Sequence, residues 1–242
     1  MPDSGTSYGH NYGDSETEST TESVRRLLSV QGPTNAFTQC FIHRTKGGVL
    51  SGSGKRRYDL CSKDSSTVLA TVQAQGGTTE TSYVITHLTD LVGKLKWDSH
   101  EFQLVDSGAN MRKLTWEQRE LFDRGELHAR TELCTVSHST NSASKTRFIR
   151  AVLRSGRERI TLLTKSPTWD PDAKHSKLDF KGRVTMPSVK NFQLIVEGEP
   201  TQKVVMQFGK VGKDAFNMDY AAPLTALQAF GIVLSVFRAG SY

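Results

Sequence analysis

A run of three cations, Lys55-Arg56-Arg57, follows a glycine- and serine-rich stretch at residues 46–54. Lysine and arginine donate charge-assisted hydrogen bonds to phosphate oxygens, and each cation near an anionic membrane leaflet contributes about 1 kcal/mol to binding. The run therefore indicates a loop that binds a phosphate-bearing partner. The alternative is a solvated hairpin whose charges serve only solubility, and the sequence leaves both open.

The charge of the chain is unevenly distributed. The net charge is +6, but residues 1–22 hold five carboxylates and no lysine or arginine, which leaves +11 for the remainder. A basic body favours an anionic partner, either a membrane surface or nucleic acid. Five arginines between residues 147 and 159 point weakly to nucleic acid, but no groove-binding helix accompanies them. We therefore expect no nucleic-acid partner.

The residues that commonly carry catalysis or bind metals have no recognisable arrangement. No metalloprotease, nucleophile-elbow or phosphate-loop motif occurs, the seven histidines are scattered, and Cys40, Cys61 and Cys134 form no CxxC pair. We therefore expect neither enzyme activity nor a metal or cofactor. The cysteine pattern and the absence of an apolar signal core favour a reducing, cytoplasmic location.

An uncharged stretch at residues 220–237 reads YAAPLTALQAFGIVLSVF. Pro223 fits the first turn of a helix, and the apolar residues that follow cover every side of a helical wheel. Such a helix is either a membrane span or enclosed by protein. Its 18 residues would reach about 27 Å, just short of a hydrocarbon core. A tail anchor stays an alternative, and we favour a core helix inside a closed sheet.

The rest of the chain supplies strands for such a sheet. A capping-box sequence at Thr115–Gln118 predicts one short helix to about Phe122. Because twelve strands are too many for a flat sheet, the sequence predicts a mainly β protein: a closed antiparallel β-barrel of about twelve strands enclosing a C-terminal apolar helix. The expected strands are Phe37–His43, Tyr58–Cys61, Val68–Gln73, Ser82–Thr86, Phe102–Val105, Thr131–Ser137, Arg147–Leu153, Arg159–Thr164, Leu178–Val184, Phe192–Val196, Lys203–Phe208 and Phe216–Asp219.

The N-terminal residues have a different composition. Residues 1–22 are rich in serine, threonine, glycine and glutamate without apolar periodicity, which predicts disorder. Residues 23–30 could form two helical turns on a partner, but a linker is the preferred interpretation. We therefore divide the chain into a disordered acidic arm at residues 1–35, with no room for another folded domain, and one folded domain at residues 36–242.

Several C-terminal motifs resemble the signature of the tubby-like proteins. They are SVKNFQ at 188–193, VMQFGKV at 205–211, FNMDY at 216–220 and PLTALQAF at 223–230, preceded by KSPTWD at 165–170 and FKGRVT at 180–185. Fainter similarities extend the resemblance back to about Phe37. The family fold is a closed antiparallel barrel threaded by its C-terminal helix, which is also the fold expected from polarity.

The resemblance implies a function. Tubby-like domains are not enzymes; they bind phosphatidylinositol 4,5-bisphosphate at the plasma membrane and carry membrane cargo, in animals often into cilia. It therefore implies a monomeric, cytoplasmic adaptor, peripheral to the plasma membrane or a cilium, with an anionic phospholipid and an unidentified protein cargo as partners.

The sequence departs from the family at the basic residues. The family's main basic cluster corresponds to residues 75–80, which read QGGTTE here, and Glu80 would repel a phosphate. The cation after Gly-Lys-Leu is kept as Lys96, beside Lys94, but lysine lacks the bidentate geometry of arginine. We expect weak headgroup binding by Lys55, Arg56, Arg57, Lys94 and Lys96. The alternative is a tubby-fold protein–protein interaction or structural module, for example of a cilium, that has lost phosphoinositide binding.

Overall fold

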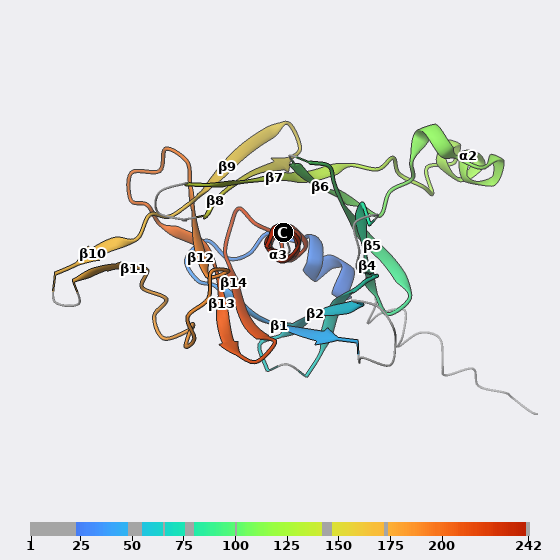
Figure 1. The fold of residues 1–242 in the computed structure, drawn as a ribbon. Coiled ribbons are helices and arrows are strands. Elements are labelled where there is room, and N and C mark those ends of the chain that lie inside the picture. Colours follow the sequence, from blue (N-terminus) through green and yellow to red (C-terminus); the bar gives the residue numbers. More distant parts are fainter. Residues whose placement is uncertain are drawn as a thin grey trace, which may run out of the picture.

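Twelve antiparallel strands close into a barrel around the C-terminal helix α3 (Ala226–Ala239) in the computed structural model of the protein (Figure 1). The structure describes residues 23–240 apart from 48–54, 65, 76–79, 100, 142–146 and 172–173. The sheet follows the order β1-β14-β13-β12-β9-β8-β7-β6-β5-β4-β3-β2, and β2 pairs with β1 to close it. The predicted mainly β barrel with an enclosed apolar helix is therefore confirmed.

Long excursions leave the barrel at two places. One carries the short 3-10 helix η2 (Met111–Lys113) and helix α2 (Trp116–Asp123), and the other carries a hairpin of strands β10 (Thr168–Asp170) and β11 (His175–Lys177). The barrel strands are β1 (Thr38–Lys46), β2 (Arg56–Ser62), β3 (Val68–Ala74), β4 (Ser82–His87), β5 (Asp90–Trp97), β6 (Glu101–Asp106), β7 (Glu132–Thr140), β8 (Arg147–Ser155), β9 (Glu158–Thr164), β12 (Phe192–Val196), β13 (Val204–Gly212) and β14 (Ala215–Tyr220).

In the barrel, one expected strand is wrong and one observed strand, β5, was not expected; the short strands β10 and β11 outside the barrel were not expected either. Residues 178–184 form a loop, because Lys181 and Gly182 both adopt positive φ and the Arg183 amide donates to the Phe180 carbonyl. Strand β5 escaped prediction because Gly93, which has no side chain, lies on its inward side beside Leu95, between a polar start and outward lysines. The two errors cancel in the strand count.

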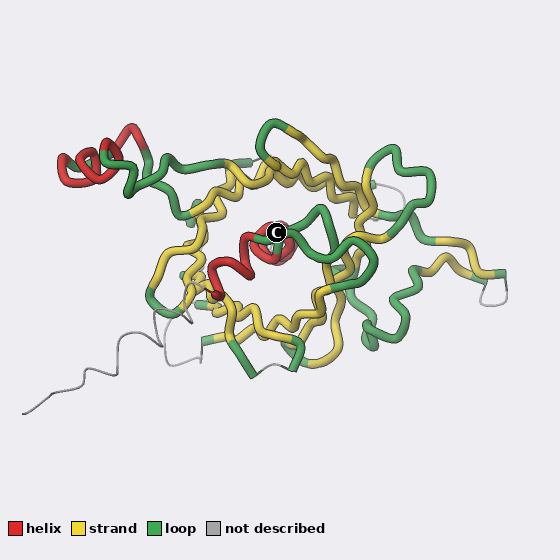
Figure 2. Tube along the Cα trace, turned by 180° about the vertical axis from the view of Figure 1, so that it is seen from behind, coloured by secondary structure: helices red, strands yellow, loops and turns green. Residues whose placement is uncertain are grey.

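Helix α3 is enclosed by protein on every side. Every residue from Ala226 to Phe237 is buried, and the helix lies along the barrel axis when viewed from behind (Figure 2). Gly231 permits the close approach of β6, since a Cβ there would stand 2.9 Å from Leu104 Cδ2. The helix starts after the N-cap Thr225, so Pro223 precedes it rather than occupying its first turn. Among the described residues, no helix has the length and hydropathy needed to cross a membrane.

Residues 23–29 form a short helix that packs beside α3 within the barrel (Figure 1, blue). Val24 and Leu28 join the hydrophobic core, with Leu28 only 1% exposed. An ion pair of 3.0 Å between Arg25 and Asp90 holds the exposed side. The expectation of a linker at residues 23–30 is wrong, because these apolar side chains pack into the core of the barrel. The ordered domain therefore begins before residue 36. The predicted disorder of residues 1–22 lies outside the described residues.

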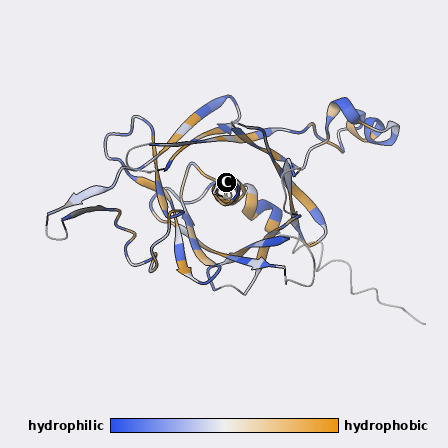
Figure 3. Cartoon of the chain, viewed as in Figure 1, coloured by the Kyte–Doolittle hydropathy of each residue, from blue (hydrophilic) through white to orange (hydrophobic). Residues whose placement is uncertain are grey.

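The predicted short helix after Thr115 is confirmed, with the capping box between Thr115 and Gln118 in place. This helix, α2, buries none of its residues and projects away from the barrel (Figure 1). Its surface is mostly hydrophilic (Figure 3), although Trp116 is 67% exposed. Helix α2 is therefore an arm outside the core.

Candidate functional site

Helix α3 divides the barrel into two unlike ends. We call the end where α3 finishes the helix-exit end; there β1, β5 and β13 end and β2, β8 and β12 begin. Alternation along a strand fixes which side chains face outward from the barrel. The cations predicted for headgroup binding can be located on this frame.

Four of the five predicted cations lie on the outer wall near the helix-exit end. Tyr58 in β2 and Leu95 in β5 are fully buried and point inward, so Arg57, Lys94 and Lys96 point outward, as does Lys55 by the same alternation. Strands β3 and β4 separate the two pairs by about 14 Å. We call these four residues the outer-wall cations.

The cations of β2 are not all free to bind a ligand. Lys55, Arg56 and Arg57 line a 310 Å³ hollow with Gln73 and Gln75. Within it, Arg57 Nε donates to both carboxylate oxygens of Asp59, at 2.8 and 2.9 Å, which partly neutralises its charge. Arg56 lies on the opposite side of the strand from Arg57, and its charge lowers the pKa of Lys190. It therefore belongs to the barrel end rather than the outer wall.

Glu80, expected to repel a phosphate, is held by its own hairpin. The backbone N–H of Gln75 donates to Glu80 Oε1 at 2.9 Å. Burial, then Tyr58 and then the Glu80 carboxylate raise the pKa of Tyr83. The charge of Glu80 therefore still acts on β4. Residues 76–79 lie outside the described residues. The acidic departure from the family is therefore also a structural link across this turn.

The cations of β5 have two neighbours that sequence reasoning missed. Burial, followed by repulsion from Arg130, Lys94 and Lys113, lowers the pKa of Lys96. Arg130 and Lys113 lie on the excursion between β6 and β7, more than fifteen residues away along the chain. Their approach depends on the path of that excursion, so no local sequence signal could have identified them. The result is a group of four cations on one side of the barrel.

The FKGRVT motif has a structural role in this protein. Arg183 donates to both oxygens of the buried Asp219 carboxylate, Nε to Oδ2 at 2.8 Å and Nη2 to Oδ1 at 2.7 Å. Gln207 Nε2 donates to the same carboxylate at 2.8 Å. Beside it, Val184 covers the backbone of Gly209, where a Cβ would collide with the Val184 side chain at 2.3 Å. The motif thus fastens the 178–184 loop onto β13 and β14.

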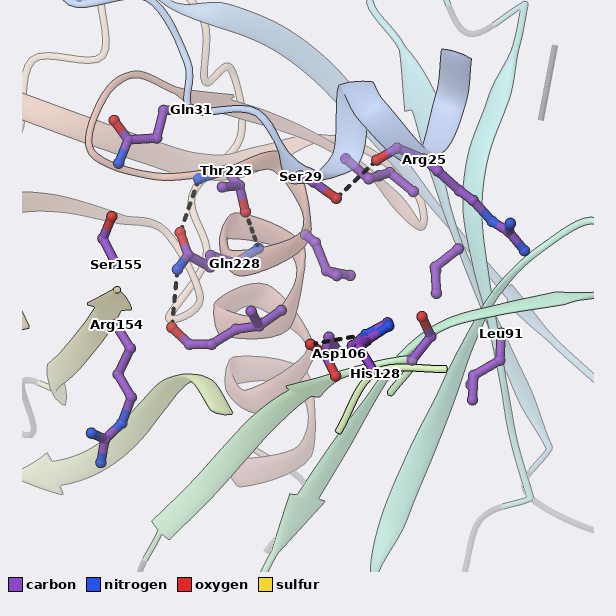
Figure 4. Close-up of a pocket in the computed structure, with 15 residues that line it drawn as sticks. Arg25, Ser29, Gln31, Leu91, Asp106, His128, Arg154, Ser155, Thr225 and Gln228 are labelled. Carbon is purple, nitrogen blue, oxygen red and sulfur yellow. Dashed lines mark hydrogen bonds and ion pairs between the residues drawn. The ribbon is translucent and has the colours of Figure 1, made fainter. Parts of the chain in front are cut away.

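A mixed-charge cavity occupies the other end of the barrel (Figure 4). It measures about 430 Å³ and lies between the 23–29 helix and the start of α3. Its polar groups satisfy one another: His128 lies 3.5 Å from Asp106, and Gln228 Nε2 donates to the Leu133 carbonyl at 2.9 Å. Cations and a carboxylate share its wall, so it has no clear preference for an anion.

The thiols and potential metal ligands show no reactive arrangement. All three cysteines are free and buried, and burial is the first cause that raises the pKa of Cys40 and of Cys134 to about 12. Such thiols are protonated at neutral pH and poorly nucleophilic. Within the described ranges, no three His, Cys, Asp or Glu side chains gather as metal ligands.

His138 should make stability depend on pH. Burial, and then the charge of Arg147, lowers the pKa of His138 to about 4, from 6.5. Because the unfolded chain takes up the proton more readily, stability is full above pH 6.5 and is lost as the pH falls toward 4. At about 1.36 kcal/mol per pKa unit, the loss is at most about 3 kcal/mol. Urea unfolding at pH 7 and pH 5 measures it.

A single variant isolates this histidine. His138→Gln should flatten the difference in stability between the two pH values. An equal pH dependence in His138→Gln and the wild type would contradict the assignment.

The C-terminal part of the chain is similar to a known protein family. Residues 140–239 match the model described as the Tub family. Over 86 residues the chain is 50% identical to "Tubby-like F-box protein 6" of Oryza sativa subsp. japonica, covering 33% of this chain and 21% of that protein. Over 78 residues it is 50% identical to "Tubby-related protein 3" of Homo sapiens, covering 32% and 17%.

A third relative, "Protein king tubby" of Drosophila sechellia, is 49% identical over 78 residues, again 32% of this chain and 17% of the relative. The chain thus matches about a fifth of the length of these curated relatives. Strands β1 to β6, and all of β7 except Thr140, lie outside the family match, and the closed barrel shows that they complete the same domain. The match over residues 140–239 and the closed barrel around α3 together support membership of the tubby-like family.

Proposed function

We propose that this tubby-like protein is a non-enzymatic adaptor that associates weakly with anionic membranes, including those that contain phosphatidylinositol 4,5-bisphosphate. The observation that carries the proposal is the position of Lys55, Arg57, Lys94 and Lys96 on one outer wall beside the helix-exit end. Membership of the tubby-like family supports the same function. A cytoplasmic location at the plasma membrane or a cilium, with a protein cargo, follows as part of this proposal.

The geometry favours diffuse electrostatic attraction over a tight headgroup pocket. The two pairs of outer-wall cations are about 14 Å apart, and Arg57 already donates a hydrogen bond to the Asp59 carboxylate. Each free cation near an anionic leaflet contributes about 1 kcal/mol, and salt screens the attraction over about 8 Å at physiological ionic strength. Binding should therefore be weak and salt-sensitive.

Vesicle co-sedimentation tests the proposal. The double variant Lys94→Gln, Lys96→Gln should bind phosphatidylcholine vesicles containing phosphatidylinositol 4,5-bisphosphate about 30-fold more weakly at low salt, since two contributions of about 1 kcal/mol are lost. The matched control Arg157→Gln, Arg159→Gln removes two cations from the β8–β9 hairpin at the opposite end, one in its turn and one at the start of β9, and should bind like the wild type. Equal losses in both double variants would mean that only net charge matters.

A second candidate function is a protein-interaction module without lipid binding. Two elements, α2 and β10, project from the barrel (Figure 1). Each carries an exposed tryptophan, Trp116 on α2 and Trp169 on β10, the latter 61% exposed. Exposed tryptophans are typical of interface hot spots. No binding of wild-type protein to the vesicles, even at low salt, would favour this candidate over the adaptor.

A further inference from the structure

Two cations from distant parts of the chain meet beside the end of α3. Lys190 lies on the loop before β12, and Arg147 is the first residue of β8. A Cβ built on Gly240 would stand 2.2 Å from Lys190 Nζ and 3.2 Å from Arg147 Nη2. Both nitrogens therefore point into the same small space, which the missing side chain of Gly240 leaves open.

The structure holds these cations together without a balancing charge from the described residues. Arg147 Nη1 donates to the Val236 carbonyl at 3.2 Å, which fixes the guanidinium at the last turn of α3 and leaves Nη2 facing Lys190. The described charged groups that lower the pKa of Lys190 are all cations: Arg147 on β8, Arg44 on β1 and Arg56 on β2. Arg44 is itself neutralised by Asp214, with Nε and Oδ1 2.6 Å apart.

A cavity of about 210 Å³ adjoins this pair. Its described lining includes Arg147, Lys190, Ser188 and Asn191 and contains no carboxylate. The hydroxyl oxygen of Ser188 accepts the Lys190 backbone N–H at 3.2 Å, so its proton can be donated into the cavity. The volume is below the roughly 300–1,000 Å³ of pockets for drug-sized molecules, which suits a small anion.

We propose that Lys190 and Arg147 form a binding site for a phosphate-class anion at the end of α3. A tetrahedral phosphate presents several acceptor oxygens, so one ion can accept from both cations and from Ser188 at charge-assisted distances. The phosphate can belong to a lipid headgroup or to a soluble molecule. This site is separate from the outer-wall cations, and its existence can be tested independently of membrane association.

Protonation should be coupled to anion binding at this site. Burial, and then Arg147, Arg44 and Arg56, lowers the pKa of Lys190 to about 8. A bound anion favours the charged amine and raises that pKa, so binding takes up a proton above pH 8. Affinity should therefore fall as the pH rises above about 8.

Titration with inorganic phosphate at low salt and pH 7, followed by calorimetry, tests the proposal. Lys190→Met keeps the apolar stem and should bind at least about tenfold more weakly, which is the loss of one charge-assisted hydrogen bond. Lys190→Arg should restore binding. The matched control is Lys165→Met, because Lys165 lines the same cavity but its amine donates to the Gln202 carbonyl at 3.5 Å. Equal affinity in Lys190→Met and the wild type would overturn the site.

A second readout follows Lys190 directly. In lysine-labelled protein, NMR can measure the pKa of the Lys190 amine with and without inorganic phosphate. Saturating phosphate should raise this pKa, and an unchanged value would refute the site. Vesicles distinguish the two sources. Reduced binding of Lys190→Met to phosphatidylinositol 4,5-bisphosphate vesicles would assign a lipid headgroup, whereas unchanged vesicle binding with lost phosphate binding would assign a soluble phosphate. Membrane association itself is judged by the Lys94 and Lys96 variants.

Discussion

Replacing Phe237 with alanine is expected to lower the free energy of unfolding by about 3–5 kcal/mol. The ring is buried near the end of α3, where it stacks on Tyr58 at 4.9 Å and meets Phe216 and Phe208 edge-on at 5.1 and 5.7 Å. These neighbours come from three barrel strands, β2, β13 and β14. Because a closed barrel is tied by hydrogen bonds around its whole circumference, it can collapse only slightly into the space that the ring leaves.

Urea denaturation measures this loss. The control is Phe148→Ala, which removes the same ring from an outward position that is 40% exposed and should change stability by no more than about 0.5 kcal/mol. A cost below about 1 kcal/mol for Phe237→Ala would show that the barrel can close around a thinner helix. In that case α3 would not be the main support of the core.

Removing Arg183 is expected to cost about 3–5 kcal/mol for a different physical reason. Asp219 is 1% exposed, and Arg183→Met would leave its carboxylate with the Gln207 amide as its remaining side-chain donor in the described structure. A buried charge without its counter-ion loses the attraction that offset its desolvation. The loss should appear as a lower urea midpoint, and the 178–184 loop should become more accessible to protease.

The double variant Arg183→Met, Asp219→Asn separates this effect from simple loss of contacts. Once the carboxylate is gone, most of the lost stability should return, since a neutral amide tolerates burial better than an unpaired charge. The exposed pair Arg124–Glu126 supplies the control, and Arg124→Met should cost about 0.5 kcal/mol or less. No recovery in the double variant would mean that the Arg183 side chain acts by packing alone.

The FKGRVT motif illustrates how function and stability are separated in this chain. A basic residue in a family motif invites a binding role, but the guanidinium of Arg183 is bound to Asp219 through two hydrogen bonds. The cations for which the described residues supply no carboxylate partner lie elsewhere: Lys94 and Lys96 on the outer wall of β5, and Lys190 and Arg147 near the end of α3. Only the pairing of each charge in three dimensions distinguishes the two groups.

The sequence named the candidate cations but not their arrangement. The sequence identified Lys55, Arg57, Lys94 and Lys96, and alternation along β2 and β5 places them on one wall. It gave no sign that Arg57 would pair with Asp59, because that contact depends on side-chain geometry. It also missed Lys190, which lies in a recognised family motif and has no unusual neighbour along the chain.

The sequence by itself determined the architecture. An uncharged helix without a wet face requires an enclosure, and enough short strands were present to form one, so polarity and strand count led to a barrel around α3. Both are local properties of the chain. The same reasoning failed at residues 23–30, where Val24 and Leu28 look too few for a stable helix until the barrel interior receives them.

Only the tertiary structure decided which charges are paired and which converge. Lys190 and Arg147 are more than forty residues apart in sequence, and they share one space because β8 and β12 flank β9 and α3 ends between them. Electrostatic interactions act through space over a few ångströms, whereas sequence records only distance along the chain. The local pattern of polar and apolar residues therefore determines the fold, and the candidate anion sites arise where closure of the barrel brings distant residues together.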